Sequence, residues 1–522
     1  MLEALCEKFD ESTNPNRVNA AQEYRKLLYY HADVWSFDNG NNVSRTPKIT
    51  HSRLDKECFE SVITGKCADM LNDINEKSHK IFRCYKYFKQ KLSSATEEQI
   101  NIISRKLLDT NSHILVVINL GPDENEQAIF DTINSAGVKL NAADIIKNAL
   151  YQKIDNRRAG AEEHYKENWW ETFEKSDEIV AIWEKKRGSG VNQKSYIDMF
   201  FHCYAIMTGF FKYSEHKLSG LSNCYKEHVR NMDAQETKAF IKDICNNAKK
   251  YKEIFIDYDP MKGYKYENHR ERLLHILSVA KVNIFDAFIL YAVNHYSKQD
   301  CNMLFKQLET YVMRNYVLGN RDVVQSYNKD LVNMLSGKFD FCEELNNQKI
   351  SKEKIQNKLR QIDNTTAKLI LFWTELYIRA TTPTSDQNET GLVYNYQLEH
   401  VMPQSWKENW SVDACPVCCE GTIVEDTENA GEIREKAIYD IGNMTLLTAK
   451  LNGQISNASF ADKLNGREIG GKFEPGIRQN SSLRITVEDI VTEPEWNEAK
   501  ISARTKKLTE LFEKIWPIPQ VN

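Results

Sequence analysis

Two short segments near the end of the chain carry side chains that could hydrolyse a phosphodiester. Glu399 and His400 stand side by side in the first, and Asn452 closes the second. A neutral imidazole can take a proton from water near physiological pH. A divalent cation such as Mg²⁺ prefers oxygen ligands and keeps several waters, so one carboxylate and one amide oxygen suffice to seat it beside a phosphate. These residue types therefore suit metal-assisted hydrolysis of a nucleic-acid backbone.

The elements around these residues must bring the two segments together. The pattern predicts a strand carrying Glu399 and His400, a turn at Pro403, a return strand from residue 441 and a helix that carries Asn452. Such a compact ββα unit would return Asn452 to face the Glu-His pair. Neighbouring strand residues point to opposite faces, so we expect a distortion such as a bulge to let both act on one substrate.

The same segments resemble the HNH endonuclease superfamily, and more closely the C-terminal nuclease domain of the GmrSD-like type IV, modification-dependent restriction proteins. The separation of Asn443 and Asn452 is nine residues, as in the HNH domains of RNA-guided nucleases. The resemblance rests on the motifs Glu-His-Val-Met-Pro-Gln-Ser (399–405) and Gly-Asn-Met-Thr-Leu-Leu (442–447), on Asn452, on the Ser-Asn…Phe…Lys stretch ending at Lys463, and on Trp496, Arg504, Leu508 and Trp516.

The resemblance assigns a role to each of these residues. It implies that Glu399 and Asn452 hold Mg²⁺ or Mn²⁺ and that His400 is the general base. Asn443 would hold the loop and orient His400, and Lys463 would contact phosphate. The implied function is defence against foreign or modified DNA by endonucleolytic cleavage that leaves a 5′ phosphate and a 3′ hydroxyl.

Other interpretations of these residues stay open at this point. A lone Glu-His pair is usually a chance feature of a strand or surface, and single asparagines are often helix caps. Only the combination, in this order and spacing, favours a nuclease fold. The alternatives are a nuclease-inactive nucleic-acid-binding or regulatory subunit of a split restriction system, and a protein-interaction scaffold.

An acidic insertion, residues 412–440, separates the two halves of the expected site. It has eight acidic residues against Arg434 and Lys436. A gate that repels DNA would explain this charge, but a solvated loop is the simpler interpretation and the one we favour. Cys415 and Cys418 form a single CxxC. Structural zinc usually needs four ligands, so zinc here would require a distant Cys or His and is not the favoured expectation.

The N-terminal part contains a second resemblance to the same proteins. The spacing of Asn134, Gly137, Leu140, Asp144 and 147–148 is similar to the helical part of their N-terminal ParB/sulfiredoxin-like module. The Asp-Gly-Gln-Gln-Arg motif of that module, which is linked to nucleotide hydrolysis, is absent from this sequence. We therefore do not expect nucleotide binding. The sequence is expected to start beyond that motif, as a truncated or split gene product, or with a separate polypeptide supplying the missing module.

Bulk properties indicate a multidomain protein, and helical spacing over most of the chain before residue 390 predicts that it is mainly α. The chain has 522 residues, 41% of them hydrophobic and 27% charged, with a net charge of −5. This charge argues against strong sequence-independent DNA coating but leaves room for a local DNA site. No apolar run is long enough to span a membrane, and twelve scattered cysteines suggest reduced thiols in the cytoplasm. We expect a helical N-terminal remainder (1–155), a helical middle domain (156–385) and the HNH domain (386–522).

Helical spacing is clearest over 97–108 and in the helix that carries Tyr311 and Arg314, which should end near Gly319. Aromatic and basic residues in the middle helices, such as Trp169, Tyr311 and Arg314, could contact DNA. At helical spacing such residues more often belong to the core, and we favour that interpretation.

Overall fold

The computed structural model of the chain contains two compact units, residues 1–129 and 130–522. The structure describes residues 1–518 apart from 31–45, 50, 52, 65–70, 77, 109–141, 155–159, 188–192, 320, 384–390 and 420–421. Asn134, Gly137 and Leu140, which belong to the N-terminal resemblance, lie outside the described residues.

The first unit is a small helical bundle with its own core. Helix α2 begins at Pro15, whose fixed φ suits the first helical turn, and the side chain of Asn14 caps it by accepting from the amide of Asn16. The helices are α1 (Leu2–Asp10), α2 (Pro15–Leu28), α3 (Arg53–Ile63), α4 (Lys80–Ser94) and α5 (Glu97–Leu108), with a short strand pair β1 (Tyr29–Tyr30) and β2 (Thr46–Pro47).

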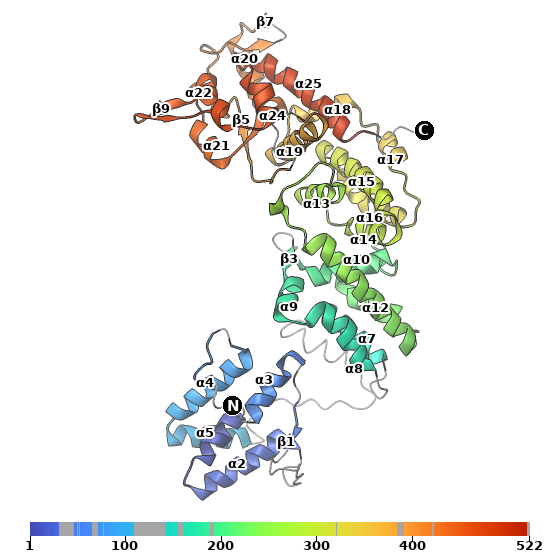
Figure 1. The fold of residues 1–522 in the computed structure, drawn as a ribbon, viewed down its shortest axis with the longest axis vertical. Helices are drawn as coiled ribbons and strands as arrows, with labels where there is room; N and C mark the ends of the chain where they lie inside the picture. Colours follow the sequence, from blue (N-terminus) through green and yellow to red (C-terminus); the bar gives the residue numbers. More distant parts are fainter. Residues whose placement is uncertain are drawn as a thin grey trace. The chain divides into compact units, whose positions relative to one another are not determined.

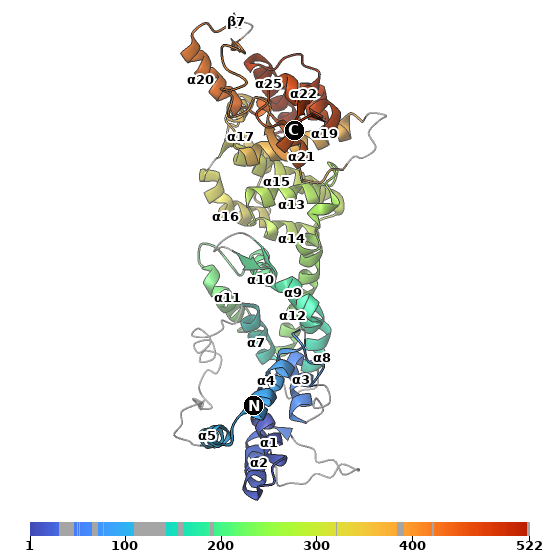
Figure 2. The same ribbon diagram turned by 90° about the vertical axis from the view of Figure 1, so that its left-hand side faces the viewer.

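The second unit begins with stacked helices (Figures 1 and 2). Helix α15 ends at Leu318, and Gly319 caps it in the left-handed conformation (φ 62°), as the sequence predicted. The elements are α7 (Ala142–Lys153), α8 (Ala161–His164), the π-helix η2 (Tyr165–Glu174), α9 (Asp177–Glu184), β3 (Lys186–Arg187), β4 (Lys194–Ser195), α10 (Tyr196–Met207), η4 (Leu218–Gly220), α11 (Leu221–His228), α12 (Ala234–Tyr251), η5 (Lys252–Ile256), η6 (Pro260–Lys262), α13 (His269–Ala280), α14 (Asp286–His295), α15 (Lys298–Leu318), α16 (Arg321–Leu335), α17 (Phe341–Asn347), α18 (Lys352–Leu359) and α19 (Asn364–Thr381).

The rest of this unit, orange to red in Figure 1, contains short strands and helices. The elements are β5 (Gln397–His400), β6 (Cys418–Cys419), β7 (Thr422–Ile423), α20 (Thr427–Ile438), η7 (Ile441–Asn443), β8 (Met444–Leu447), α21 (Ala449–Ile455), α22 (Phe460–Asn465), β9 (Arg467–Ile469), β10 (Lys472–Glu474), α23 (Ile477–Asn480), α24 (Arg484–Thr486), η8 (Val487–Val491) and α25 (Glu498–Ile515). The prediction of a mainly α protein is confirmed.

One hydrophobic core extends from Ala143 to Trp516, across the expected boundary at residue 385. The end of α25 returns to α15 and closes this core. Arg314 donates to the Trp516 carbonyl at 2.8 Å and pairs with Glu513 at 2.5 Å, while the Trp516 indole donates to Glu309. The expected domain boundaries near 155 and 385 stay predictions, and the C-terminal helix packs on a helix of the expected middle domain.

The aromatic and basic residues named in the middle helices lie in the core. Trp169, Tyr311 and Arg314 are all buried, in keeping with core positions and not with a DNA-contacting surface. Among the described residues, none of the helices combines the length and hydropathy needed to cross a bilayer.

Candidate active site

Strands β5 and β8 form the framework of the candidate site. They pair antiparallel without interruption, from Gln397 opposite Leu447 to His400 opposite Met444. The expected bulge at Glu399 and His400 is therefore absent from these four pairs. Side chains alternate along the strand, so Gln397 and Glu399 share one face and His400 lies on the other. Helix α21 follows β8 directly, which gives the strand–strand–helix order that the sequence indicated.

Glu399 forms a buried ion pair with Lys463 from α22. The Lys463 ammonium donates to Oε1 of Glu399 at 2.5 Å and to the His400 carbonyl at 3.0 Å, and the lysine side chain is 0% exposed. Burial raises the pKa of the Glu399 carboxyl, and the lysine charge opposes this shift. Burial likewise lowers the pKa of Lys463, and Glu399 opposes that. Lys463, which was expected to contact phosphate, is buried, and its charge compensates that of the Glu399 carboxylate.

The Asn452 side chain contacts Gln397, which lies two residues before Glu399 on the same face of β5. Its Nδ2 donates to Oε1 of Gln397 at 3.0 Å. This bond fixes the amide, and it leaves Oδ1 of Asn452 buried without a hydrogen-bond partner. A buried acceptor without a donor is costly, so an unused amide oxygen bound to the strand face that also carries Glu399 is a suitable position for an oxygen-seeking cation.

The His400 imidazole packs beside the half-exposed ring of Tyr439, with ring centroids 6.3 Å apart. Its Nε2 is buried and has no hydrogen-bond partner. Burial, together with the smaller effect of the positive charge of Lys463, lowers the pKa of His400 to about 4. The ring is therefore neutral near pH 7, the state in which one ring nitrogen can accept a proton.

Asn443 holds the loop that follows β5. Its Oδ1 accepts from the Met402 amide at 2.9 Å and from the Trp496 indole at 3.1 Å, and its Nδ2 donates to the carbonyls of Met402 and Ile438. The Asn443 backbone carbonyl also accepts from the amide of Val401. This fully buried side chain thus fixes the two residues after His400 and does not face a substrate.

The C-terminal helix α25 supports β8 from behind. Arg504 donates to the carbonyls of Gly442 at 2.8 Å, Met444 at 2.6 Å and Ile485 at 2.9 Å. The Thr505 hydroxyl bonds to Asp440 and accepts from the Gly442 amide. Buried carbonyls at the start of β8 are thereby satisfied, which fixes the strand that pairs with Glu399 and His400.

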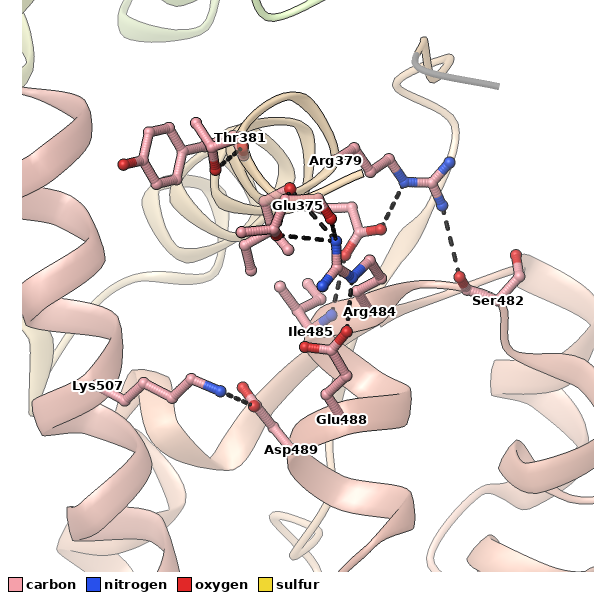
Figure 3. Close-up of polar contacts among 12 residues, drawn as sticks. Glu375, Arg379, Thr381, Ser482, Arg484, Ile485, Glu488, Asp489 and Lys507 are labelled. Atoms are coloured by element: carbon pink, nitrogen blue, oxygen red, sulfur yellow. Dashed lines mark hydrogen bonds and ion pairs between the residues drawn. The ribbon is translucent and has the colours of Figure 1, made fainter. Parts of the chain in front are cut away.

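Residues of α24 bond to α19, as Figure 3 shows, and α24 also bonds to β8. Glu375 accepts from the Ile485 amide at 2.9 Å and from Arg379 at 2.6 Å, and Arg484 donates to the carbonyl of Thr382. Thr445 on β8 bonds to Thr486 on α24 at 2.7 Å. Glu375 therefore connects the middle helices to the strand beside Glu399.

The acidic insertion is anchored by one buried arginine. Arg434 on α20 pairs with Glu498 at 2.7 Å and donates to the carbonyls of Trp410 and Cys415 at 2.5 and 2.7 Å. Glu428, Glu432 and Glu435 on this helix are exposed, and so are Asp413 and Glu425. Exposed acids on an anchored helix favour the solvated interpretation over a gate that swings away.

The cysteines of the insertion contribute no recognisable metal ligand set. Cys415 and Cys418 are free and half-buried. Across the part of the chain that the structure describes, no group of three or more His, Cys, Asp or Glu side chains could hold a metal ion. The cation site expected at Glu399 and Asn452 is a different type, because its protein ligands would be one carboxylate and one amide.

Family models match both ends of the chain. The model described as "GmrSD restriction endonucleases, C-terminal domain" matches residues 344–511, which include β5, β8, α21 and α22. The model described as "GmrSD restriction endonuclease, N-terminal domain" matches residues 4–151. Together these segments cover more than half of the sequence. The chain belongs to the GmrSD restriction endonuclease family.

GmrSD membership confirms the type IV restriction family expected from the motifs, and it assigns the chain to the DNA endonucleases of restriction defence. Both GmrSD domains are present in this one chain, and a separate polypeptide that completes the N-terminal module stays a prediction. No curated protein matches the sequence.

The residues that support the candidate site and its surroundings were not predicted from the sequence. Gln397, which holds Asn452, carries a usable signal, because a residue two positions before Glu399 must share its strand face. Arg434 and Glu375 carry no such signal, since their partners Glu498 and Ile485 are distant in sequence and become neighbours only in the fold.

Proposed function

We propose that the C-terminal part of this protein is an HNH-type nuclease that hydrolyses DNA phosphodiester bonds. Glu399 and Asn452 would hold Mg²⁺ or Mn²⁺, and His400 would act as the general base. The observation that carries this proposal is the pairing of β5 with β8. It places Glu399 and the Asn452–Gln397 pair on one face of the strand and His400, the last residue of the strand, on the other.

The unused polar atoms of the site agree with this chemistry. Oδ1 of Asn452 and Nε2 of His400 are buried and lack partners, and each has the character its role requires: an oxygen ligand and a proton acceptor. A divalent cation bound there would supply charge neutralisation at the phosphate and the leaving oxygen. Lys463 compensates the charge of the Glu399 carboxylate, and Asn443 holds the loop after His400 in place. Both act as positioning residues.

A plasmid-nicking assay tests the proposal. We expect the purified full chain to convert supercoiled plasmid to nicked or linear DNA with MgCl₂ or MnCl₂. His400→Ala should reduce the rate by at least about a hundredfold, since general-base catalysis typically contributes that much. The assay should be run in parallel on plasmid that carries the base modifications of phage DNA and on unmodified plasmid.

The matched control is His295→Ala, because His295 is an exposed histidine on α14 far from these strands in sequence. It should cleave like the wild type. Equal residual cleavage in the wild type and in His400→Ala would contradict the proposal and favour a nuclease-inactive binding subunit.

A further inference from the structure

The middle helices enclose a cavity of about 610 Å³ that is separate from the candidate nuclease residues. It lies between α7, α10, the η4–α11 segment and the start of α14. This volume falls within the range of small-molecule pockets. Most of its lining belongs to residues 194–287, between the two segments that the family models match.

One face of α10 contributes two polar groups to the cavity. Asp198 and His202 are four residues apart and therefore lie on the same side of the helix. Oδ2 of Asp198 accepts from the Ser195 hydroxyl at 2.6 Å, whereas Oδ1 is buried and has no partner. Nε2 of His202 is also buried without a partner.

A third polar group comes from the start of α14. Asp286 is 3% exposed and lines the cavity. Its Oδ2 accepts from Arg187 at 2.8 Å, and its Oδ1 has no hydrogen-bond partner. Burial raises the pKa of Asp286, and Arg187 opposes this shift. A buried carboxylate oxygen without a donor is costly, so the fold retains two such oxygens in one cavity at a cost in stability.

The remaining walls are largely aliphatic. They include Ile145, Met199, Ile206, Leu221 and Ile284. Flat apolar walls with a few acceptors suit a planar molecule with N–H donors. Lys194 adds one cation to the wall beside the two carboxylates, and a bare metal ion would leave the apolar surface unused.

We propose that this cavity binds a nucleoside-sized nitrogen heterocycle with an exocyclic amino group, such as adenine or cytosine. The amino group donates to the unpartnered oxygens of Asp198 and Asp286, and the ring lies between the aliphatic walls. His202 meets a second polar edge of the ring. The inference is independent of the nuclease site, because it shares no residue with β5, β8 or α21.

Isothermal titration of the full chain with adenosine, inosine, cytidine and uridine tests the proposal. At least one amino-bearing nucleoside should bind at least about tenfold more tightly than its deaminated counterpart, because a site built for a donor rejects an analogue without it. Asp198→Asn should remove this preference. Ser222→Phe, which places a ring in the cavity from α11, should abolish binding.

Asp300→Asn provides a matched control. Asp300 occupies the same position in α15 that Asp198 has in α10: its carboxylate accepts from the capping serine three residues earlier, at 2.7 Å. The two variants should therefore lose similar helix stability, and only Asp198→Asn should lose the preference for amino-bearing nucleosides. Failure of all four nucleosides to bind the wild type at millimolar concentration would overturn the proposal. The proposal would also be overturned if Asp198→Asn kept the wild-type preference and Ser222→Phe bound the nucleosides as tightly as the wild type.

The base could be free in solution or carried on a DNA strand. Titration with a short oligodeoxynucleotide of the preferred base separates the two sources. Tighter binding than the nucleoside, lost in Ser222→Phe, assigns the site to a base of a strand. Weaker binding than the nucleoside assigns it to a free ligand.

Discussion

Lys463 lies against Glu399 with its ammonium 2.5 Å from Oε1, and the lysine side chain has no exposed surface. Removing a charge from water is costly unless a partner compensates it. The carboxylate that we propose as a cation ligand is therefore kept inside the fold by a lysine that the motif alone would place at the substrate.

Lys463→Met should destabilise the second unit by about 3 kcal/mol, because it leaves the buried Glu399 carboxylate without its partner. The double variant Glu399→Gln with Lys463→Met should recover much of this loss, since no charge is then left unpaired. Urea denaturation followed by tryptophan fluorescence measures both. If the double variant is no more stable than Lys463→Met, the two residues are not coupled as described.

Asn452→Ala should weaken metal-dependent cleavage at only a small cost in stability, because it removes an amide oxygen without a partner and one exposed hydrogen bond to Gln397. We expect the Mg²⁺ concentration for half-maximal cleavage to rise about tenfold or more, as for lost ligands and their supports. Chelation with EDTA should stop cleavage, and added Mg²⁺ should restore it. Asn429→Ala, an exposed asparagine on α20, is the control. An unchanged Mg²⁺ requirement in Asn452→Ala would exclude Asn452 as a ligand.

Asn443→Ala should cost about 3 kcal/mol or more, because it leaves the Met402 amide and the Trp496 indole without an acceptor. Asn409→Ala also removes an asparagine bond to a backbone carbonyl, but at an exposed position, and should cost well under about 1 kcal/mol. Thermal denaturation compares them. Similar losses in both variants would show that the Asn443 network contributes little.

Gly442→Ala should prevent α25 from docking on η7. A β-carbon at Gly442 would overlap the Ile501 carbonyl and the Thr505 hydroxyl, and it would lie 2.9 Å from the Thr505 amide. We expect low yield of soluble protein and rapid proteolysis of the C-terminal region. Gly431→Ala is the control: its β-carbon would meet nothing within 4 Å, and alanine favours helix α20 by about 1 kcal/mol. Soluble, protease-resistant Gly442→Ala would contradict the close approach.

Asp440 should make the stability of the second unit fall as the pH rises. Burial raises its pKa to about 6 from an ordinary value of 3.8. The native state therefore keeps a proton that the unfolded chain releases. The contribution is complete below about pH 3.8 and is lost as the pH rises through 6, with a total of about 3 kcal/mol. The melting temperature of Asp440→Asn relative to the wild type, measured from pH 4 to 7, should rise with pH. A difference that does not change with pH would show that Asp440 titrates normally.

Local patterns predicted those parts of the fold that depend on neighbours in sequence. Helix α5 matches the predicted 97–108, and Gly319 ends α15 because a left-handed cap there favours glycine. The two strands and α21 follow in the predicted order around Glu399 and Asn452. The family resemblance is confirmed by both matched segments.

Long-range contacts account for what the sequence could not indicate. Trp516 and Arg314 lie 202 residues apart and yet share a hydrogen bond that joins the expected middle and C-terminal domains. The Lys463 ammonium is engaged by Glu399 only because α22 packs beneath β5. Neither contact follows from spacing or periodicity, since each depends on how separate elements stack.

The position of α25 has a consequence for synthesis of the protein. Arg504 satisfies carbonyls of η7 and β8, and Trp516 completes the core around α15. On the ribosome, the strand opposite His400 must therefore wait for residues 504–516 before it is fully supported. If the proposed cleavage activity is correct, a chain still being translated would be harmless to nearby DNA until this helix has emerged.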